Sequence, residues 1–402
     1  MTTDTSHGFE CFAPCPRGLE KPLAAELESL GASETATVGG GVTFNATQEL
    51  IAPLNKGSRL ASRILIKLTS RRYRTDKDLY KIAHATAWED WFDAHQTLRV
   101  DSNAVRASIG NLNIATLRVK DAIVDRLREQ FGERPDIDTR HPQVRVFVFL
   151  TDKIATLYLD TSGDNLFKRG WRGREDKGAA PLKENLAAGL LALAQWSPGI
   201  PLLDPFCGSG TIVIEAAQQS LGVPPGNLRE FGYERLNFTR RSVWEEAAQN
   251  TTAVASPETA DNTLPLTPQI YARDLDPAMV GIARANTKTA GAEKAIASIE
   301  QADFMTALPP DCAPGMMISN PPYGERMDFA GKGASVWRAD EGLLSLGRHL
   351  REHYAGWKVC LLSGDLKLPG KLGLKASRRI ELFNGPIEAR LFIFEMRKRS
   401  AN

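Results

Sequence analysis

The stretch IPLLDPFCGSGTIVIEAA, residues 200–217, decides the fold. An apolar run of strand length leads into a glycine-rich loop, and a helical pattern follows at once over residues 211–220. The glycines at 208 and 210 let a ligand approach the backbone, and the amino end of the helix offers free N–H groups. This order of strand, loop and helix indicates a parallel sheet that binds its ligand at the carboxyl ends of the strands.

Strand and helix patterns continue to alternate on both sides of this stretch. Helices are predicted over 181–196, 277–292 and 335–356, and strands in QIYARDLDP, ASIEQADF, MMISNPPYGER and WKVCLLSGD. The segment RRIELFNGPIEARLFIFEM has the alternation of an antiparallel hairpin. We therefore predict an α/β, Rossmann-like core, with a mostly parallel sheet and a C-terminal antiparallel hairpin.

The N-terminal half has a mixed α+β pattern without a catalytic constellation. Helices are expected over 17–32, 78–92 and 113–132, and 58–73 is expected to be a helix that runs into a strand. VTFNA and TLRVDSNA are expected to be strands, and VRVFVFL and KIATLYLD an antiparallel pair. A basic, glycine-rich stretch over 162–181 is interpreted as a junction, and the Pro/Thr-rich stretch 250–268 as a surface insertion.

The bulk composition limits the classes of function. The net charge is only +2, so charge alone does not announce nucleic-acid binding. No apolar run is long enough for a membrane span, and the N-terminus has no secretory pattern, which predicts a cytoplasmic protein. Five cysteines without zinc spacing predict reduced thiols and no metal site.

The glycine loop differs from the common phosphate-binding loops. Val213 replaces the third glycine of a dinucleotide loop, and no Gly-Lys-Ser/Thr follows. The Asp204 carboxylate would repel a pyrophosphate but can accept a hydrogen bond from an ammonium group. These features favour an amino-acid ligand over a dinucleotide, although a plain strand–helix turn would look similar.

Acidic residues recur at the ends of the next two predicted strands. Asp274 is placed to bind a ribose diol, with Asp276 as an alternative, and Asp303 is placed for an adenine amine. Each of them alone could be a helix N-cap. Together they point to an adenosine ligand with a positively charged end.

Asn320-Pro321-Pro322-Tyr323 follows the fourth predicted strand. The prolines stiffen the backbone, so that the Asn320 side-chain oxygen and the Pro321 carbonyl can act as two fixed acceptors. Two acceptors suit an exocyclic amine, and Tyr323 offers a face on which a base can stack. Positioning and electrostatics would then carry the catalysis, without a strong general base.

The stretches CPRGLEKPLAAELESLGA, LFKRGWR, APLKENLAAGLL, LDPFCGSGTIVIEAA, SNPPYGER and FNGPIEARLFIFE resemble one known family. The right half resembles class I S-adenosylmethionine-dependent methyltransferases. The whole chain resembles the RlmL-like 23S rRNA guanine-N2 methyltransferases, which carry a THUMP domain. The resemblance implies a ferredoxin-like segment over 1–60, a THUMP domain over 61–161, a linker over 162–180 and a methyltransferase domain over 181–402.

The resemblance also implies roles for single residues. S-adenosylmethionine would be the cofactor, and Asp274 and Asp303 would hold its ribose and adenine. The remaining cofactor residues are Asp204, Phe206, Gly208, Gly210 and Thr211 of the loop, and Pro181, Lys183 and Asn185 of the helix that closes over the methionine end. The residues at the target base are Asn320, Pro321, Pro322 and Tyr323. The expected RNA phosphate contacts are Arg71, Arg72, Arg74, Lys168, Arg169 and Arg172.

Several alternatives stay open from the sequence. Adenine-N6 methyltransferases share the same loop, so chemistry alone does not separate guanine N2 from adenine N6. Related THUMP enzymes act on tRNA, and an RNA-binding ribosome-assembly factor with a vestigial core is a non-enzymatic alternative. Since the chain ends at Asn402, the second methyltransferase domain of some RlmL proteins is not expected. The target nucleotide, the choice between naked RNA and an assembly particle, and the oligomeric state are left open.

Overall fold

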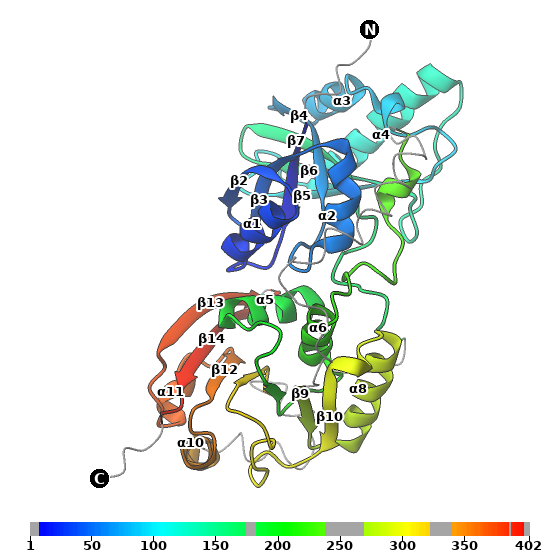
Figure 1. Ribbon diagram of the computed structural model, residues 1–402. Helices are drawn as coiled ribbons and strands as arrows, with labels where there is room; N and C mark the ends of the chain where they lie inside the picture. The colour runs from blue at the N-terminus through cyan, green and yellow to red at the C-terminus, as the bar shows by residue number, and fades with distance from the viewer. Residues whose placement is uncertain (1–7, 174–181, 238–268, 322–339, 386, 398–402) are drawn as a thin grey trace. The chain divides into compact units, whose positions relative to one another are not determined.

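A computed structural model describes residues 8–173, 182–237, 269–321, 340–385 and 387–397 (Figure 1). The chain divides into two units. The N-terminal unit holds the residues up to 14, residues 24–166 and the described part of the segment that begins at 229. The C-terminal unit holds 15–23, 167–228 and the described residues from 269 onward. The predicted insertion at 250–268 lies outside the described residues.

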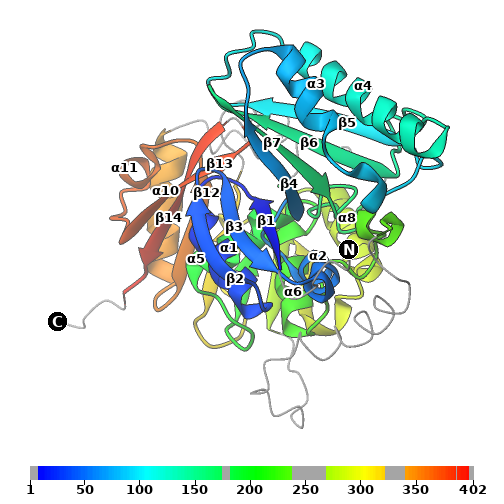
Figure 2. The same cartoon turned by 90° about the horizontal axis from the view of Figure 1, so that it is seen from above.

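One seven-stranded sheet forms the centre of the N-terminal unit, in the order β2-β3-β1-β4-β7-β6-β5. Its strands are β1 (Phe9–Pro14), β2 (Ser33–Val38), β3 (Gly41–Ala46), β4 (Leu65–Arg72), β5 (Leu98–Ala104), β6 (Val144–Leu150) and β7 (Ile154–Asp160). The helices are α2 (Ile51–Gly57), α3 (Asp76–His84), α4 (Leu112–Phe131) and the part of α1 (Glu20–Ser29) from residue 24 onward. Helices α3 and α4 lie side by side along the β5–β7 side of the sheet (Figure 2).

Local sequence explains the best-predicted elements of this unit. The side chains of β6 alternate between buried and partly exposed, and β6 pairs antiparallel with β7, which confirms the predicted pair. Helix α4 begins where the Asn111 side chain accepts from the Asn113 N–H at 2.9 Å, and it ends at Gly132 with φ +76°.

The strand expected in the second part of 58–73 is confirmed as β4, but the helix expected in its first part is wrong, because a buried carboxylate binds that backbone. Glu26 accepts from the Ser58 hydroxyl at 2.5 Å and from the N–H groups of Arg59 and Leu60 at 3.0 and 3.2 Å. These bonds hold the chain in a non-helical turn between α2 and β4, and burial raises the pKa of Glu26. Strands β1 and β2 were not predicted, and β2 is largely exposed, so that it lacks the alternation of a half-buried strand.

The C-terminal unit contains the α/β core, which confirms the predicted fold class. Its sheet has the order β10-β9-β8-β11-β12-β14-β13. The strands are β8 (Leu202–Asp204), β9 (Ile270–Asp274), β10 (Ile296–Gln301), β11 (Met316–Ser319), β12 (Lys358–Ser363), β13 (Arg378–Asn384) and β14 (Ile387–Glu395). The helices are α5 (Glu184–Ala194), α6 (Thr211–Ser220), α8 (Pro277–Thr289), α10 (Asp340–His353) and α11 (Leu368–Lys371).

Helices cover both faces of this sheet. Leu202 and Leu203 point to opposite faces because they are consecutive in a strand. Leu203 packs in one cluster with Leu346 of α10, Leu368 of α11 and Phe392 of β14. Helices α5 and α6 lie on the other side of the sheet (Figure 1). Strands β8 to β12 run parallel, while β13 and β14 add the predicted antiparallel hairpin. None of the described helices is both long and apolar enough to cross a membrane.

The stretch predicted as a junction is tightly packed in its described part. The side chains of Arg169 and Glu215 are 1% and 0% exposed, and they form an ion pair at 3.0 Å. Trp171, two residues further on, is also buried. This part of the chain is therefore anchored on helix α6 by a charge pair inside the C-terminal unit.

We predict that Glu215→Gln lowers the free energy of unfolding by about 3–5 kcal/mol, because it removes the buried carboxylate that is paired with the Arg169 cation. Urea unfolding followed by circular dichroism measures the change. The matched control is Glu388→Gln, whose partly exposed pair with Arg390 spans 3.4 Å and should matter little. Equal effects of both variants would show that the Arg169–Glu215 pair does not anchor the segment.

Candidate functional site

Four parallel strands end at one edge of the C-terminal sheet. The order β10-β9-β8-β11 places the ends of β8 and β11 next to each other, with β9 beside β8. The residues at or just after these ends are Asp204, Asp274, Asp303 and Asn320. Because the chain order reverses between β8 and β11, this edge is a topological switch point, where sheets of this class bind ligands.

The loop after β8 is open toward a ligand at one glycine and packed at the other. Gly208 has φ +51°, and a Cβ added there would meet nothing within 4 Å. Gly210 has φ +87°, and a Cβ there would lie 3.3 Å from the Cβ of Ala283 on α8. Gly208 thus leaves room for a ligand beside the backbone, while Gly210 lets α8 approach the loop.

Asp204 ties the end of β8 to the end of β11. Its Oδ1 accepts from the Ser319 hydroxyl at 2.5 Å and from the Phe206 N–H at 3.2 Å. Burial raises the pKa of Asp204 to about 7, helped by the Asp274 carboxylate and opposed by these two hydrogen bonds. The carboxyl lies in a place where a cationic partner would favour its ionised form.

Asp274 completes the glycine loop from the neighbouring strand. Its carboxylate accepts from the Gly208 N–H at 2.8 Å and from the Asp276 N–H at 3.0 Å. Burial also raises the pKa of Asp274, and these N–H groups oppose the rise. Asp276, the predicted alternative, caps helix α8 instead, since its side chain accepts from the Ala278 N–H at 2.8 Å.

An aromatic surface follows β10. Asp303 is exposed, and its side chain accepts from the Met305 N–H at 2.9 Å. The next residue, Phe304, is buried, and its ring meets that of Phe206 edge to face, with 5.3 Å between the centroids. Phe304 was not among the predicted site residues, although it directly follows Asp303 in the sequence. The arrangement places apolar rings from β8 and β10 beside the acidic strand ends.

Asn320 lies directly after β11, next to Ser319. Its Oδ1 is buried, and no residue in the described part of the chain donates a hydrogen bond to it. Pro321 is buried, whereas Pro322 and Tyr323 lie outside the described residues. A buried acceptor oxygen without a donor is costly unless a ligand or another part of the chain supplies one.

The predicted cofactor residues near the beginnings of α5 and α6 differ in their exposure to solvent. Pro181 lies outside the described residues. Lys183 is exposed, with its ammonium 5.0 Å from the centroid of the Phe167 ring. Asn185 and Thr211 are buried at the beginnings of α5 and α6.

The structure corrects one of the expected RNA contacts, Arg169, and places the side chain of a second, Arg172, against other segments of the C-terminal unit. Arg169 is buried and paired with Glu215, so its guanidinium is not available to a phosphate. Arg172 is only partly exposed and donates to Glu184, Ser209 and Thr211. The local sequence showed a basic run, but it did not show the carboxylates that other segments bring to it. The residues that remain exposed are Lys168, Arg71, Arg72 and Arg74.

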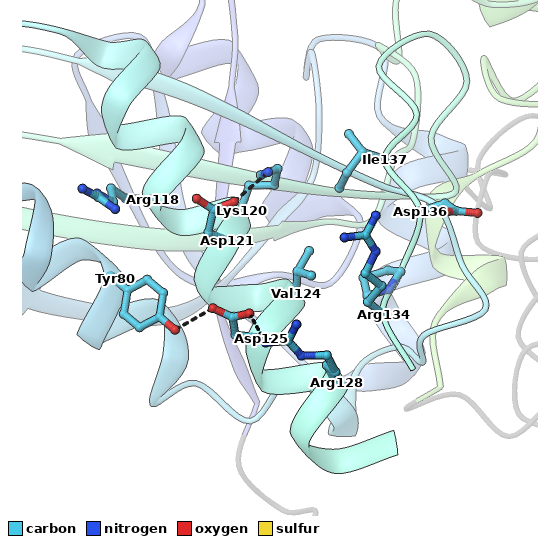
Figure 3. Close-up of a pocket in the computed structure, with 11 residues that line it drawn as sticks. Tyr80, Arg118, Lys120, Asp121, Val124, Asp125, Arg128, Arg134, Asp136 and Ile137 are labelled. Atoms are coloured by element: carbon cyan, nitrogen blue, oxygen red, sulfur yellow. Dashed lines mark hydrogen bonds and ion pairs between the residues drawn. The ribbon is translucent and has the colours of Figure 1, made fainter. Parts of the chain in front are cut away.

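A separate pocket of about 440 Å³ opens on the N-terminal unit, beside α4 (Figure 3). Its basic side chains include Arg118, Lys120 and Arg128, and each of these forms an ion pair with a nearby aspartate. The Tyr80 hydroxyl donates to Asp125 at 2.8 Å. Because the charges are largely neutralised in pairs, we assign this pocket no ligand.

The geometry of the switch point suits a ligand with positive charge next to a target that donates hydrogen bonds. Two carboxyls with raised pKa values lie on the side of β8 and β9, and the buried acceptor of Asn320 lies on the side of β11. Ser319, which joins the two sides, was not predicted. A signal for it was present, because a serine ends the otherwise apolar strand Met316–Ser319.

Three family models match this chain in succession. Residues 10–65 match the RlmL ferredoxin-like domain, residues 73–160 match the THUMP domain, and residues 169–393 match the RMKL-like methyltransferase domain. The ribosomal RNA large subunit methyltransferase K/L of Psychromonas ingrahamii is 37% identical over 94% of this chain and 49% of its own length. The protein of the same name from Shewanella amazonensis is 35% identical over 96% of this chain and 53% of its own length. The chain thus spans about half the length of the curated relatives it matches.

Solved structures agree with these matches. The crystal structure of SMU.472 complexed with SAH superimposes with a TM-score of 0.83 at 29% identity, covering 98% of this chain and 100% of the other. A Listeria monocytogenes protein, described as a predicted N6-adenine-specific DNA methylase, gives a TM-score of 0.81 at 28% identity, with 96% of each chain covered. The resemblance stated from the sequence is confirmed, and because residues 169–393 are more than half of its length, the chain belongs to the family of RMKL-like methyltransferase domains.

Proposed function

We propose that this chain transfers a methyl group from S-adenosylmethionine to the exocyclic N2 of a guanine in RNA, and that this RNA is 23S rRNA. The observation that carries the proposal is the buried Asn320 Oδ1, which no described residue satisfies. It lies one residue after Ser319, whose hydroxyl is bound to Asp204 of the glycine loop. The Asn320 oxygen, which can accept from an amine, is therefore linked through Ser319 and one hydrogen bond to Asp204 of the glycine loop. That loop suits a cationic ligand.

The residues at β8 and β9 fit S-adenosylmethionine, which would supply an electrophilic methyl group on a positively charged sulfur. Asp204 would face the ammonium end, and the open backbone at Gly208 would allow close approach. Asp274 would accept from the ribose hydroxyls, and Asp303 from the adenine amine. Phe206 and Phe304 would give the adenosine an apolar surface. Proteins similar to this chain include SMU.472, whose crystal structure contains SAH.

At the target base, Asn320 and Pro321 would accept from the two hydrogens of the exocyclic amine. The nitrogen lone pair of such an amine is delocalised into the ring, so the amine is a weak nucleophile. Acceptors fixed at the strand end would hold both hydrogens and direct the lone pair toward the methyl group. The new N–C bond would replace the methyl–sulfur bond, SAH would be the leaving group, and one amine proton would be released to solvent. Tyr323 would then stack on the base, which has to leave any duplex to reach the site.

RNA capture is assigned to the N-terminal unit. A THUMP domain matches residues 73–160, and the curated relatives are named for ribosomal RNA of the large subunit. Arg71 and Arg72 at the end of β4 and Arg74 are exposed in this unit, and Lys168 is exposed in the C-terminal unit; these four would contact phosphates. An enzyme acting on ribosomal RNA would work in the cytoplasm.

An adenine-N6 activity is the second candidate, because the Asn-Pro-Pro-Tyr loop serves any exocyclic amine. The Listeria monocytogenes protein described above is named for that activity. Only the chemical product separates the two, so the test has to identify the modified nucleoside.

We expect the wild-type protein to transfer labelled methyl groups to large-subunit rRNA from cells that lack it, with N2-methylguanosine found by mass spectrometry of the nucleosides. Asn320→Ala should lower the rate of transfer by at least about a hundredfold, because the amine loses an oriented acceptor. Its affinity for SAH, measured by titration calorimetry, should stay within about twofold of wild type.

Asn227→Ala is the control, since it removes an exposed amide of the same unit and should leave both the rate and the affinity unchanged. A product of N6-methyladenosine, or a product only in tRNA, would move the activity to a sister family. SAH binding without any product on naked RNA or on precursor particles would favour the assembly-factor alternative.

The affinity for SAH should depend on pH through Asp204. Above pH 7 the carboxyl is already ionised, whereas below pH 7 it carries a proton that a bound ammonium group must displace. The dissociation constant should therefore rise up to about tenfold for each pH unit below 7. Asp204→Asn should bind weakly and with a flatter pH profile, and a variant that keeps the wild-type slope would remove Asp204 from this role.

Asp274→Ala should weaken SAH binding by about ten- to a hundredfold, because it removes the ribose acceptor and the partner of the Gly208 N–H. Asp276→Ala should instead lower the melting temperature, since it removes the cap of α8 while leaving the affinity nearly unchanged. Calorimetric titration and thermal melting of both variants measure the difference. The reverse pattern would transfer the ribose role to Asp276.

A further inference from the structure

Arg172 connects segments of the C-terminal unit that are far apart in the sequence. Its guanidinium donates to the Ser209 hydroxyl at 2.8 Å and to the Thr211 hydroxyl at 3.0 Å. It also donates to the Glu184 carboxylate at 3.0 Å and to the Leu182 carbonyl at 3.4 Å. One side chain therefore touches the glycine loop, the start of α6 and the entry to α5.

These partners surround the backbone that a ligand would approach. Ser209 and Thr211 flank Gly210, whose φ of +87° is the left-handed conformation on which the turn into α6 depends. Leu182 and Glu184 are the residues at which the chain enters α5, the helix beside α6. Because Arg172 binds the residues on both sides of Gly210, it also fixes the position of Gly208, the glycine at which a ligand can approach the backbone.

The contacts use properties that only a guanidinium combines. It is planar, and it has five N–H donors in a rigid fork, whereas a lysine ammonium has one nitrogen and cannot reach acceptors in all these segments at once. The guanidinium carbon lies 4.9 Å from the centroid of the Trp171 ring, and Trp171 is buried. The Glu184 carboxylate balances the charge, so the cation is held by the fold and not left for an external anion.

We propose that Arg172 is a positioning residue that holds the glycine loop in its ligand-binding shape and is not a contact for RNA phosphates. The inference rests on the proposed function, because the ligand of the loop is taken to be S-adenosylmethionine. Arg172 would act through Ser209 and Thr211, and it need not touch the cofactor.

The test compares Arg172→Lys with Arg284→Lys in the full chain. Arg284 of α8 donates to the Ile299 carbonyl at 2.6 and 3.2 Å, so the control makes the same exchange away from the loop. For Arg172→Lys we expect about tenfold weaker SAH binding and about tenfold faster amide hydrogen exchange over residues 205–213 of the ligand-free protein. RNA affinity should not change, and the control should change none of these quantities.

A double-mutant cycle with Ser209→Ala separates positioning from independent effects. If Arg172 acts through Ser209, the two losses should not add. The double variant should then bind SAH as tightly as whichever of Arg172→Lys and Ser209→Ala alone has the lower affinity. Additive losses would overturn the proposal, as would lost RNA affinity with unchanged SAH binding. Should Arg172→Lys fail to fold, Ser209→Ala and Thr211→Val should each speed the exchange several-fold, and unchanged exchange in both would refute the proposal. A wild-type chain that binds no SAH would refute the proposed function, whereas the exchange rates of the ligand-free protein test Arg172 separately.

Discussion

The candidate site depends on one hydrogen bond, from the Ser319 hydroxyl to the buried carboxyl of Asp204. Parallel pairing of β8 with β11 brings these two strand ends together, through Met316 beside Leu202 and Met317 beside Leu203. The bond then fixes the glycine loop relative to Asn320, which follows Ser319 in the chain. A carboxyl in this position is costly to ionise without a positive partner, so the sheet itself prepares the site for a cationic ligand.

The fold of the C-terminal unit could be predicted closely because its signals are local. Helix α6 occupies the residues 211–220 that the pattern predicted, and it begins directly after Gly210. Asp204, Asp274, Asp303 and Asn320 also come to the same sheet edge, as strand ends in a parallel sheet must. In this unit the apolar runs determine where the strands lie, and the ends of the strands determine where the site residues lie.

The failures have a common physical origin in partners from distant segments. Glu26 determines the backbone at residues 58–60, and Glu215 determines the burial of Arg169. In both cases an ionisable side chain is satisfied by a group more than thirty residues away, which no local pattern contains. A basic run such as that around Arg169 therefore predicts charge but not exposure. The residues next to Glu26 and Arg169 in the sequence do not show which distant group each of these side chains will bind.

Strand β4 has a consequence for how such chains can change over evolution. The ferredoxin-like match ends at residue 65 and the THUMP match begins at residue 73, yet β4 fills the interval and pairs with β1 on one side and β7 on the other. The ferredoxin-like and THUMP segments, which are matched separately in the sequence, are thus joined by the backbone hydrogen bonds of β4. Exchanging either segment alone would leave an unpaired strand edge, which is a template for aggregation. The pairing through β4 therefore favours inheritance of the two segments together.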